Sequence, residues 1–213
     1  MALLLAGCFP TYQVARIDPG WHLDAGATWL HDQPRDSLQQ GADLLFSAGP
    51  VYGWDSRVEI GLPLVAYFEG AGGGAQDRFT WLMPYLKLGL LPESSRNHLA
   101  VSLQGSILGL GNIGLHASRE MGDWEPQVSF GYIVSGGPAG DDPVVTRFQR
   151  DEQSLLTFAV GATGRGWQRP SIQLGVLRNR FRTHTVYGSD GRDDEHRTFW
   201  DLFIAVGYRF SGR

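Results

Sequence analysis

His116 and Ser118, near the middle of the chain, have the types and the spacing that nucleophilic catalysis uses. Residues two apart on a β-strand lie on the same face, so the imidazole could remove the proton of the hydroxyl. Such a pair also needs a carboxylate to orient the imidazole, and Glu120 and Glu125 are the nearest candidates. Because two residues in a turn-rich stretch often match by chance, an ordinary strand with no catalytic role explains them equally well.

The His-x-Ser spacing resembles that of the lipid A deacylase barrel, in which a histidine activates a serine. This resemblance implies a lipid A-modifying hydrolase, which we keep as an alternative function. The chain contains no G-x-S-x-G sequence and no Cys/His cluster for zinc, and the glycine-rich residues 70–74 lack the Lys-Ser/Thr of a phosphate loop. We therefore predict that the protein is not an enzyme and uses no cofactor or metal.

Strands must position these side chains, and alternation between apolar and polar residues predicts strands along most of the chain. The last of them places Leu202, Ile204, Val206, Tyr208 and Phe210 on one face. The composition agrees with an all-β protein, with 29 glycines and 12% aromatic residues. We predict ten strands, near residues 21–30, 42–53, 56–68, 79–91, 97–108, 112–118, 124–135, 153–163, 170–184 and 196–210.

The alternation allows two folds of opposite sidedness. In a soluble lipocalin-like binder the apolar faces form the core, whereas in an outer-membrane barrel they face lipid and the polar faces line the lumen. Glycine, small hydroxyls and isolated charges dominate the polar faces here, and aromatic residues gather near the strand ends, which favours the membrane barrel. A formal net charge of -4 argues against a nucleic-acid binder.

We therefore predict a closed antiparallel transmembrane β-barrel of about ten strands, with eight as the alternative, in the bacterial outer membrane. Residues 1–20 would form a truncated signal and periplasmic lead-in, residues 21–210 the barrel and residues 211–213 a tail. Pro50, Pro63, Pro84 and Pro126 lie inside predicted strands, where each removes a ladder donor. If these prolines break the strands, the predicted count is wrong.

Ionisable residues on the polar faces are the candidates to line the lumen. In a narrow barrel they would pair into a structural core or line a gated pore. The predicted lumen residues are His22, Asp24, Asp43, Arg57, Glu59, Lys87, His98, Asp201 and Arg209.

Two sequence stretches resemble those of known groups of bacterial envelope proteins. The sequence Leu-Ala-Gly-Cys ending at Cys8 resembles the lipobox of bacterial lipoproteins, which implies lipidation of Cys8, although the segment before it is short for a signal peptide. The hairpin at residues 51–64 is similar to one in the outer-membrane transporters grouped with the meta-pathway of phenol degradation. That resemblance implies a barrel fold and a transport role.

The expected partners are lipids and the machinery that inserts barrels. The sequence AVGYRF, within residues 202–210, resembles the C-terminal signal read by the outer-membrane barrel assembly machinery. Arg178, Arg180 and Arg182 alternate along one strand and could meet lipopolysaccharide phosphates, or simply form a charged strand end. We expect a non-enzymatic, narrow porin-like channel or structural barrel, which could handle small hydrophobic solutes.

Overall fold

A computed structural model describes residues 14–31, 42–68, 78–105, 111–135, 149–166, 168–187 and 191–211. Strands make up nearly all of this part of the chain. Within the described ranges no helix is long and apolar enough to cross a membrane. The strands are β1 (Gly20–His31), β2 (Ala42–Gly53), β3 (Val58–Gly61), β4 (Leu64–Phe68), β5 (Arg78–Leu82), β6 (Tyr85–Gly89), β7 (Asn97–Gly105), β8 (Gly111–Arg119), β9 (Trp124–Ser135), β10 (Gln149–Gly164), β11 (Gln168–Tyr187) and β12 (Gly191–Ser211).

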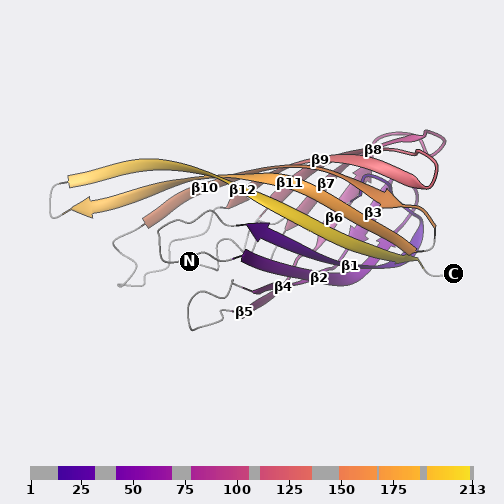
Figure 1. The fold of residues 1–213 in the computed structure, drawn as a ribbon, viewed down its shortest axis with the longest axis horizontal. Helices are drawn as coiled ribbons and strands as arrows, with labels where there is room; N and C mark the ends of the chain where they lie inside the picture. Colours follow the sequence, from indigo (N-terminus) through magenta and orange to yellow (C-terminus); the bar gives the residue numbers. More distant parts are fainter. Residues whose placement is uncertain are drawn as a thin grey trace.

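The strands close into one antiparallel barrel (Figure 1). From β6 to β12 each strand pairs with its neighbour in the sequence, β2 pairs with both β3 and β4, β3 pairs with β6 and β4 pairs with β5. β1 pairs with both β2 and β12 to complete the ring. β3 with β4, and β5 with β6, each follow one line of the barrel wall, so the twelve segments form ten barrel strands. The predicted ten-stranded closed barrel is confirmed.

Proline interrupts two barrel strands without breaking the wall. Pro63 separates β3 from β4 and Pro84 separates β5 from β6. The ladder continues across both gaps, because the Leu62 amide donates to the Pro50 carbonyl (3.0 Å) and the Met83 amide donates to the Pro63 carbonyl (2.9 Å). The proline carbonyls therefore still accept hydrogen bonds from neighbouring amides, although each proline lacks the N–H that would donate one.

The barrel is apolar outside and polar inside. Leu103, Ile172 and Ile204 point outward and are 50%, 48% and 39% exposed. Glu59 and Lys87, by contrast, are fully buried in the interior. This sidedness is the one expected for a membrane barrel and the reverse of a lipocalin, so the soluble-binder alternative is not favoured.

The connections and strand extensions at the two ends of the barrel differ in length. Short connections at residues 54–57, 90–96 and 120–123, and between β10 and β11 at residues 165–166, share the end where β1 begins and β12 finishes, which we call the turn end. At the opposite end, the loop end, β10, β11 and β12 extend beyond their neighbours (Figure 1). Short turns on one side and long extensions on the other are typical of outer-membrane barrels.

Candidate functional site

Residues 14–19, which we call the lead-in, lie inside the barrel at the turn end. Val14, Ala15, Ile17 and Asp18 are all buried although they belong to no strand. Their position is fixed by backbone contacts: the Lys87 ammonium donates to the carbonyl oxygens of Val14 (3.0 Å) and Arg16 (3.3 Å). The wall leaves room for the lead-in at Gly53, where a Cβ atom would overlap the Asp18 carbonyl oxygen.

A group of charged wall residues surrounds the lead-in; we call Asp24, Glu59, Lys87 and Arg209, together with Tyr85, the mouth cluster. Glu59 accepts from Lys87 Nζ at 2.6 Å, from Arg209 Nη1 at 2.9 Å and from the Tyr85 hydroxyl at 2.9 Å. Arg209 also donates two bonds to Asp24, at 2.8 and 2.7 Å. Two carboxylates, Asp24 and Glu59, thus face two cations, Lys87 and Arg209, and most of the hydrogen-bonding groups of these four side chains have partners. Buried charges are tolerated under this condition.

Asp18 connects the lead-in to this cluster. Its carboxylate pairs with Arg169 from β11, with Arg16 at 3.0 Å and, more distantly, with Arg209 at 3.7 Å. Burial raises the pKa of Asp18, but the guanidinium groups of Arg169, Arg209 and Arg16 outweigh it, so the pKa lies below its ordinary value.

A second group of charges holds the lead-in to the rim. Glu120, in the turn after β8, accepts from Arg16 Nη1 at 2.7 Å, and it lies 3.3 Å from His98 Nε2 and 3.1 Å from Arg165 Nη2. Partial burial raises the pKa of Glu120, while the His98 bond and the Arg16 and Arg165 charges lower it to a net value below the ordinary one. Arg16 therefore links the lead-in to the rim through the Glu120 carboxylate.

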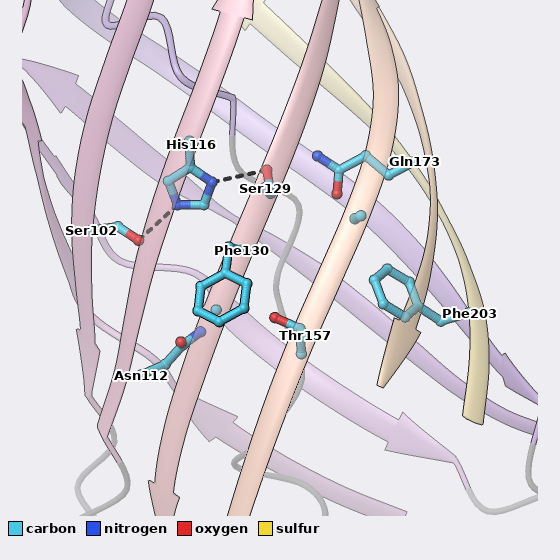
Figure 2. Close-up of a pocket in the computed structure, with 10 residues that line it drawn as sticks. Ser102, Asn112, His116, Ser129, Phe130, Thr157, Gln173 and Phe203 are labelled. Atoms are coloured by element: carbon cyan, nitrogen blue, oxygen red, sulfur yellow. Dashed lines mark hydrogen bonds between the residues drawn. The ribbon is translucent and has the colours of Figure 1, made fainter. Parts of the chain in front are cut away.

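The middle of the interior is neutral and centres on His116 (Figure 2). His116 on β8 bonds through its two ring nitrogens to Ser102 on β7 (2.9 Å) and to Ser129 on β9 (3.0 Å). The ring lies over Gly114, where a Cβ atom would overlap both His116 and Ser102. The imidazole therefore joins three neighbouring strands.

The predicted His116–Ser118 pair is not assembled. Both ring nitrogens of His116 are used by Ser102 and Ser129, and the Ser118 hydroxyl donates instead to Glu125. Glu120, the other proposed carboxylate, lies in the rim group with Arg16. The spacing correctly placed both side chains on the inner face, but neighbouring strands supply nearer partners for each.

The space around His116 is small. A void of about 20 Å³ lies among Ser102, Asn112, Thr157 and Gln173 (Figure 2). That volume holds about one water molecule. Within the described residues, Asn112 Oδ1 and both amide atoms of Gln127 are buried without a hydrogen-bond partner. Buried polar atoms in a polar cavity are the usual place for internal water.

The structure places most of the predicted lumen residues in the interior. His22, Asp24, Glu59, Lys87, His98, Asp201 and Arg209 point inward from the wall. The side chain of Asp43 and the whole of Cys8 lie outside the described residues. Arg178 faces outward, with its Cζ atom 5.7 Å from the centre of the Trp200 ring. The structure does not describe the side chains of Arg180 and Arg182.

Arg57 is a correction to the predicted lumen set. It is exposed in the turn between β2 and β3. The Asp55 carboxylate accepts hydrogen bonds from the backbone amides of Arg57 (2.7 Å) and Val58 (3.0 Å), which forms a side-chain-stabilised turn and delays the start of β3. The alternation of Arg57 with Glu59 had suggested that the strand begins earlier.

Sequence reasoning missed Arg16, Asp18 and Arg169, which hold the lead-in, and Tyr85 of the mouth cluster. It named Glu120 for a different role, as a partner of His116 and not of Arg16. The available signal was the charge pair of Arg16 and Asp18 directly before Pro19-Gly20, in a stretch without strand alternation. Among the residues described, no group of three or more His, Cys, Asp or Glu side chains could hold a metal ion.

Comparisons with known proteins give similarities to solved structures and no family. Neither a protein-family profile nor a curated protein matches the sequence. Among solved structures, the fold is similar to the beta domain of the Bordetella autotransporter BrkA, with 12% identity and a TM-score of 0.47 over 91% of this chain and 99% of that one.

Proposed function

We propose that the protein is an integral β-barrel of the bacterial outer membrane with a structural, non-enzymatic role and a closed lumen. The observation that carries the proposal is the sidedness of the wall. Large apolar side chains cover the outside, and fully buried Glu59 and Lys87 lie inside. An exterior of this kind would be unstable in water and is the normal surface of a barrel in lipid.

The height of the apolar exterior supports this proposal. On β12, Trp200, Leu202, Ile204, Val206 and Phe210 are exposed on the outer face. The ten residue steps between the first and the last span about 33 Å along the strand at about 3.3 Å each. With the strand tilt of about 40° usual in barrels, the height is about 25 Å, which is the apolar thickness of outer-membrane barrels.

The interior favours a closed barrel over an open porin-like channel. The mouth cluster and the lead-in fill the turn end, and the void beside His116 has room for about one water. A route for small hydrophobic solutes, which the resemblance to the phenol-pathway transporters implies, would need apolar space larger than this void. The transport role is therefore the less favoured form of the proposal.

Lipids and the assembly machinery are the proposed partners. Arg178 lies against exposed Trp200 near the loop end of the apolar belt, where a lipopolysaccharide phosphate would be within reach of an outward guanidinium. Residues 202–210, with their alternating apolar face, are the proposed signal for barrel insertion. Lipidation of Cys8 would add a second attachment to the same membrane.

Membrane fractionation and a pair of substitutions test the proposal. The protein should remain with outer membranes after alkaline extraction without detergent, and it should show little steady conductance in planar bilayers. Ile204→Arg, in the middle of the belt, should destabilise the barrel in vesicles by about 2–4 kcal/mol, whereas Trp54→Arg in the exposed turn should cost about 0–1 kcal/mol. Release by alkali, or equal effects of the two substitutions, would contradict membrane insertion, and a large steady conductance would contradict the closed lumen.

A further inference from the structure

We propose that the lead-in is a tethered plug, which closes the turn end of the barrel and can be withdrawn to admit water and small ions to the polar interior. This inference rests on the proposed membrane-inserted barrel and adds a moving part to it. Three features of the described residues support it: the side-chain contacts that hold the lead-in, the charge pairs that remain in the wall without it, and the polar void next to it.

The lead-in is held by side chains rather than by a strand ladder. None of the described strand pairings includes residues 14–19. Its attachments are the Lys87 bonds to two carbonyl oxygens, the His22 bond to the Asp18 carbonyl (2.9 Å), and the ion pairs of Arg16 and Asp18. Withdrawal would therefore break these contacts and leave every strand–strand pairing of the barrel intact.

The wall remains almost fully compensated without the plug. Glu59 keeps Lys87 and Arg209, Arg209 keeps Asp24, and all four residues belong to barrel strands. At the rim, Glu120 keeps His98 and Arg165. Arg169 loses the Asp18 carboxylate but retains its bond to the Gly166 carbonyl near the solvent. Both the closed and the open arrangement thus avoid a deeply buried, unpaired wall charge, which is the condition for a two-state element.

A polar chamber adjoins the plug. Lys87, which holds the lead-in, is the direct ladder partner of Ser102, and Ser102 bonds to His116 in the small void. Asn112 and Gln127 present unpartnered buried polar atoms in the same described interior. Water that passed the plug and the mouth cluster would therefore meet hydrogen-bonding groups, and the plug is the part of this closure that does not belong to the wall.

Thiol accessibility in the folded barrel tests the plug. The parent carries Cys8→Ser, to remove the native thiol, and Ile17→Cys, to place one in the buried part of the plug itself, where withdrawal would expose it. The reagent is a small, membrane-impermeant methanethiosulfonate, applied to protein inserted in lipid vesicles with the turn end facing the reagent. Insertion is checked by alkaline extraction, so that a failure of the barrel proposal is distinguished from a failure of the plug.

Two release variants should open the mouth. Arg16→Gln with Asp18→Asn removes the ion pairs of the lead-in, and Arg169→Gln removes only the nearer of the two strand arginines that pair with Asp18. Each should increase the labelling rate by about ten-fold, because losing a charge-assisted bond shifts an opening equilibrium by about that factor. Arg96→Gln removes an exposed arginine from a turn at the same end and should label at the parental rate.

Heat-dependent gel mobility identifies the variants that are folded, and only these are compared. Faster labelling in either folded release variant, with no change in Arg96→Gln, supports the plug. Rapid labelling of the parent would overturn the proposal, since the lead-in would then not close the mouth. Parental rates in the folded release variants would overturn it as well.

Discussion

The turn end and the middle of the barrel interior both bury polar side chains, but they pair them with different chemistry. At the turn end, Glu59, Lys87 and Arg209 carry full charges and bond to one another over distances of 2.6–3.2 Å. In the middle, His116 joins Ser102 and Ser129 through uncharged hydroxyl groups. Both regions are buried, but the charged one joins strands that are far apart in the sequence, whereas His116 joins three consecutive strands.

The difference shows what each region depends on. The charged region is stable only as a complete network, because removing one member leaves another charge buried without its partner. The neutral region can exchange a lost partner for water, since a small void adjoins it. We therefore expect substitutions at the turn end to be more costly than equivalent substitutions in the middle.

The largest effect is expected for Glu59→Gln. This change leaves Lys87 and Arg209 without their shared carboxylate and should lower the free energy of unfolding by about 3–5 kcal/mol. Reversible urea unfolding in lipid vesicles would measure it. The double variant Glu59→Leu with Lys87→Met should be less destabilised than Glu59→Gln, because it removes the pair together. A loss below 1 kcal/mol for the single change would show that the network is not a unit.

A smaller effect is expected for His116→Ala. It removes two hydrogen bonds between neutral groups and should cost about 1–3 kcal/mol. Gly114→Ala provides the matched test, since the added Cβ would overlap the His116 ring. Gly114→Ala should destabilise the parent more than it destabilises the His116→Ala protein. Additive losses in this double-mutant cycle would mean that the ring does not occupy the space over Gly114.

The smallest effect is expected from mild acid at the rim. The pKa values of Asp18 and Glu120 are lowered in the folded protein, so these carboxylates contribute stability above their ordinary pKa values of about 4, and this contribution is lost as the pH falls through the lowered values. Arg16, Arg165, Arg169, Arg209 and His98 are the groups that face them.

Unfolding midpoints measured between pH 7 and pH 3 would follow this loss. The midpoint should decrease at the acid end of the range, and Glu120→Gln should give a flatter profile together with a lower midpoint at pH 7. An identical acid-end slope in the parent and in Glu120→Gln would exclude a contribution of this carboxyl group.

The strands of the wall were predictable from the sequence, because an apolar outer face and a polar inner face require apolar and polar residues to alternate along every strand. Residues such as Leu202 and Ile204 must alternate with inward residues, and this requirement leaves a local signal. Pro63 and Pro84 were identified as threats to the wall, but their effect depends on backbone acceptors in other segments, which no local pattern displays.

The candidate site was less predictable because its partners are distant in the sequence. Asp18 meets Arg169 across 151 positions, and Arg209 meets Asp24 across 185. Nothing in the sequence around Arg16 and Asp18 indicates whether this stretch lies inside or outside the ring. The partners of His116 were not predicted either, because they come from the two flanking strands and not from Ser118 on the same strand.

The position of Arg209 imposes an order on assembly. Arg209 lies in the last strand, yet it bonds to Asp24 in the first and approaches Asp18 in the lead-in. During biogenesis the Asp24 carboxylate of β1 can therefore be neutralised by Arg209 only after β12 has been placed beside β1. Sealing the ring and neutralising the Asp24 carboxylate are therefore coupled events, completed by one side chain of β12.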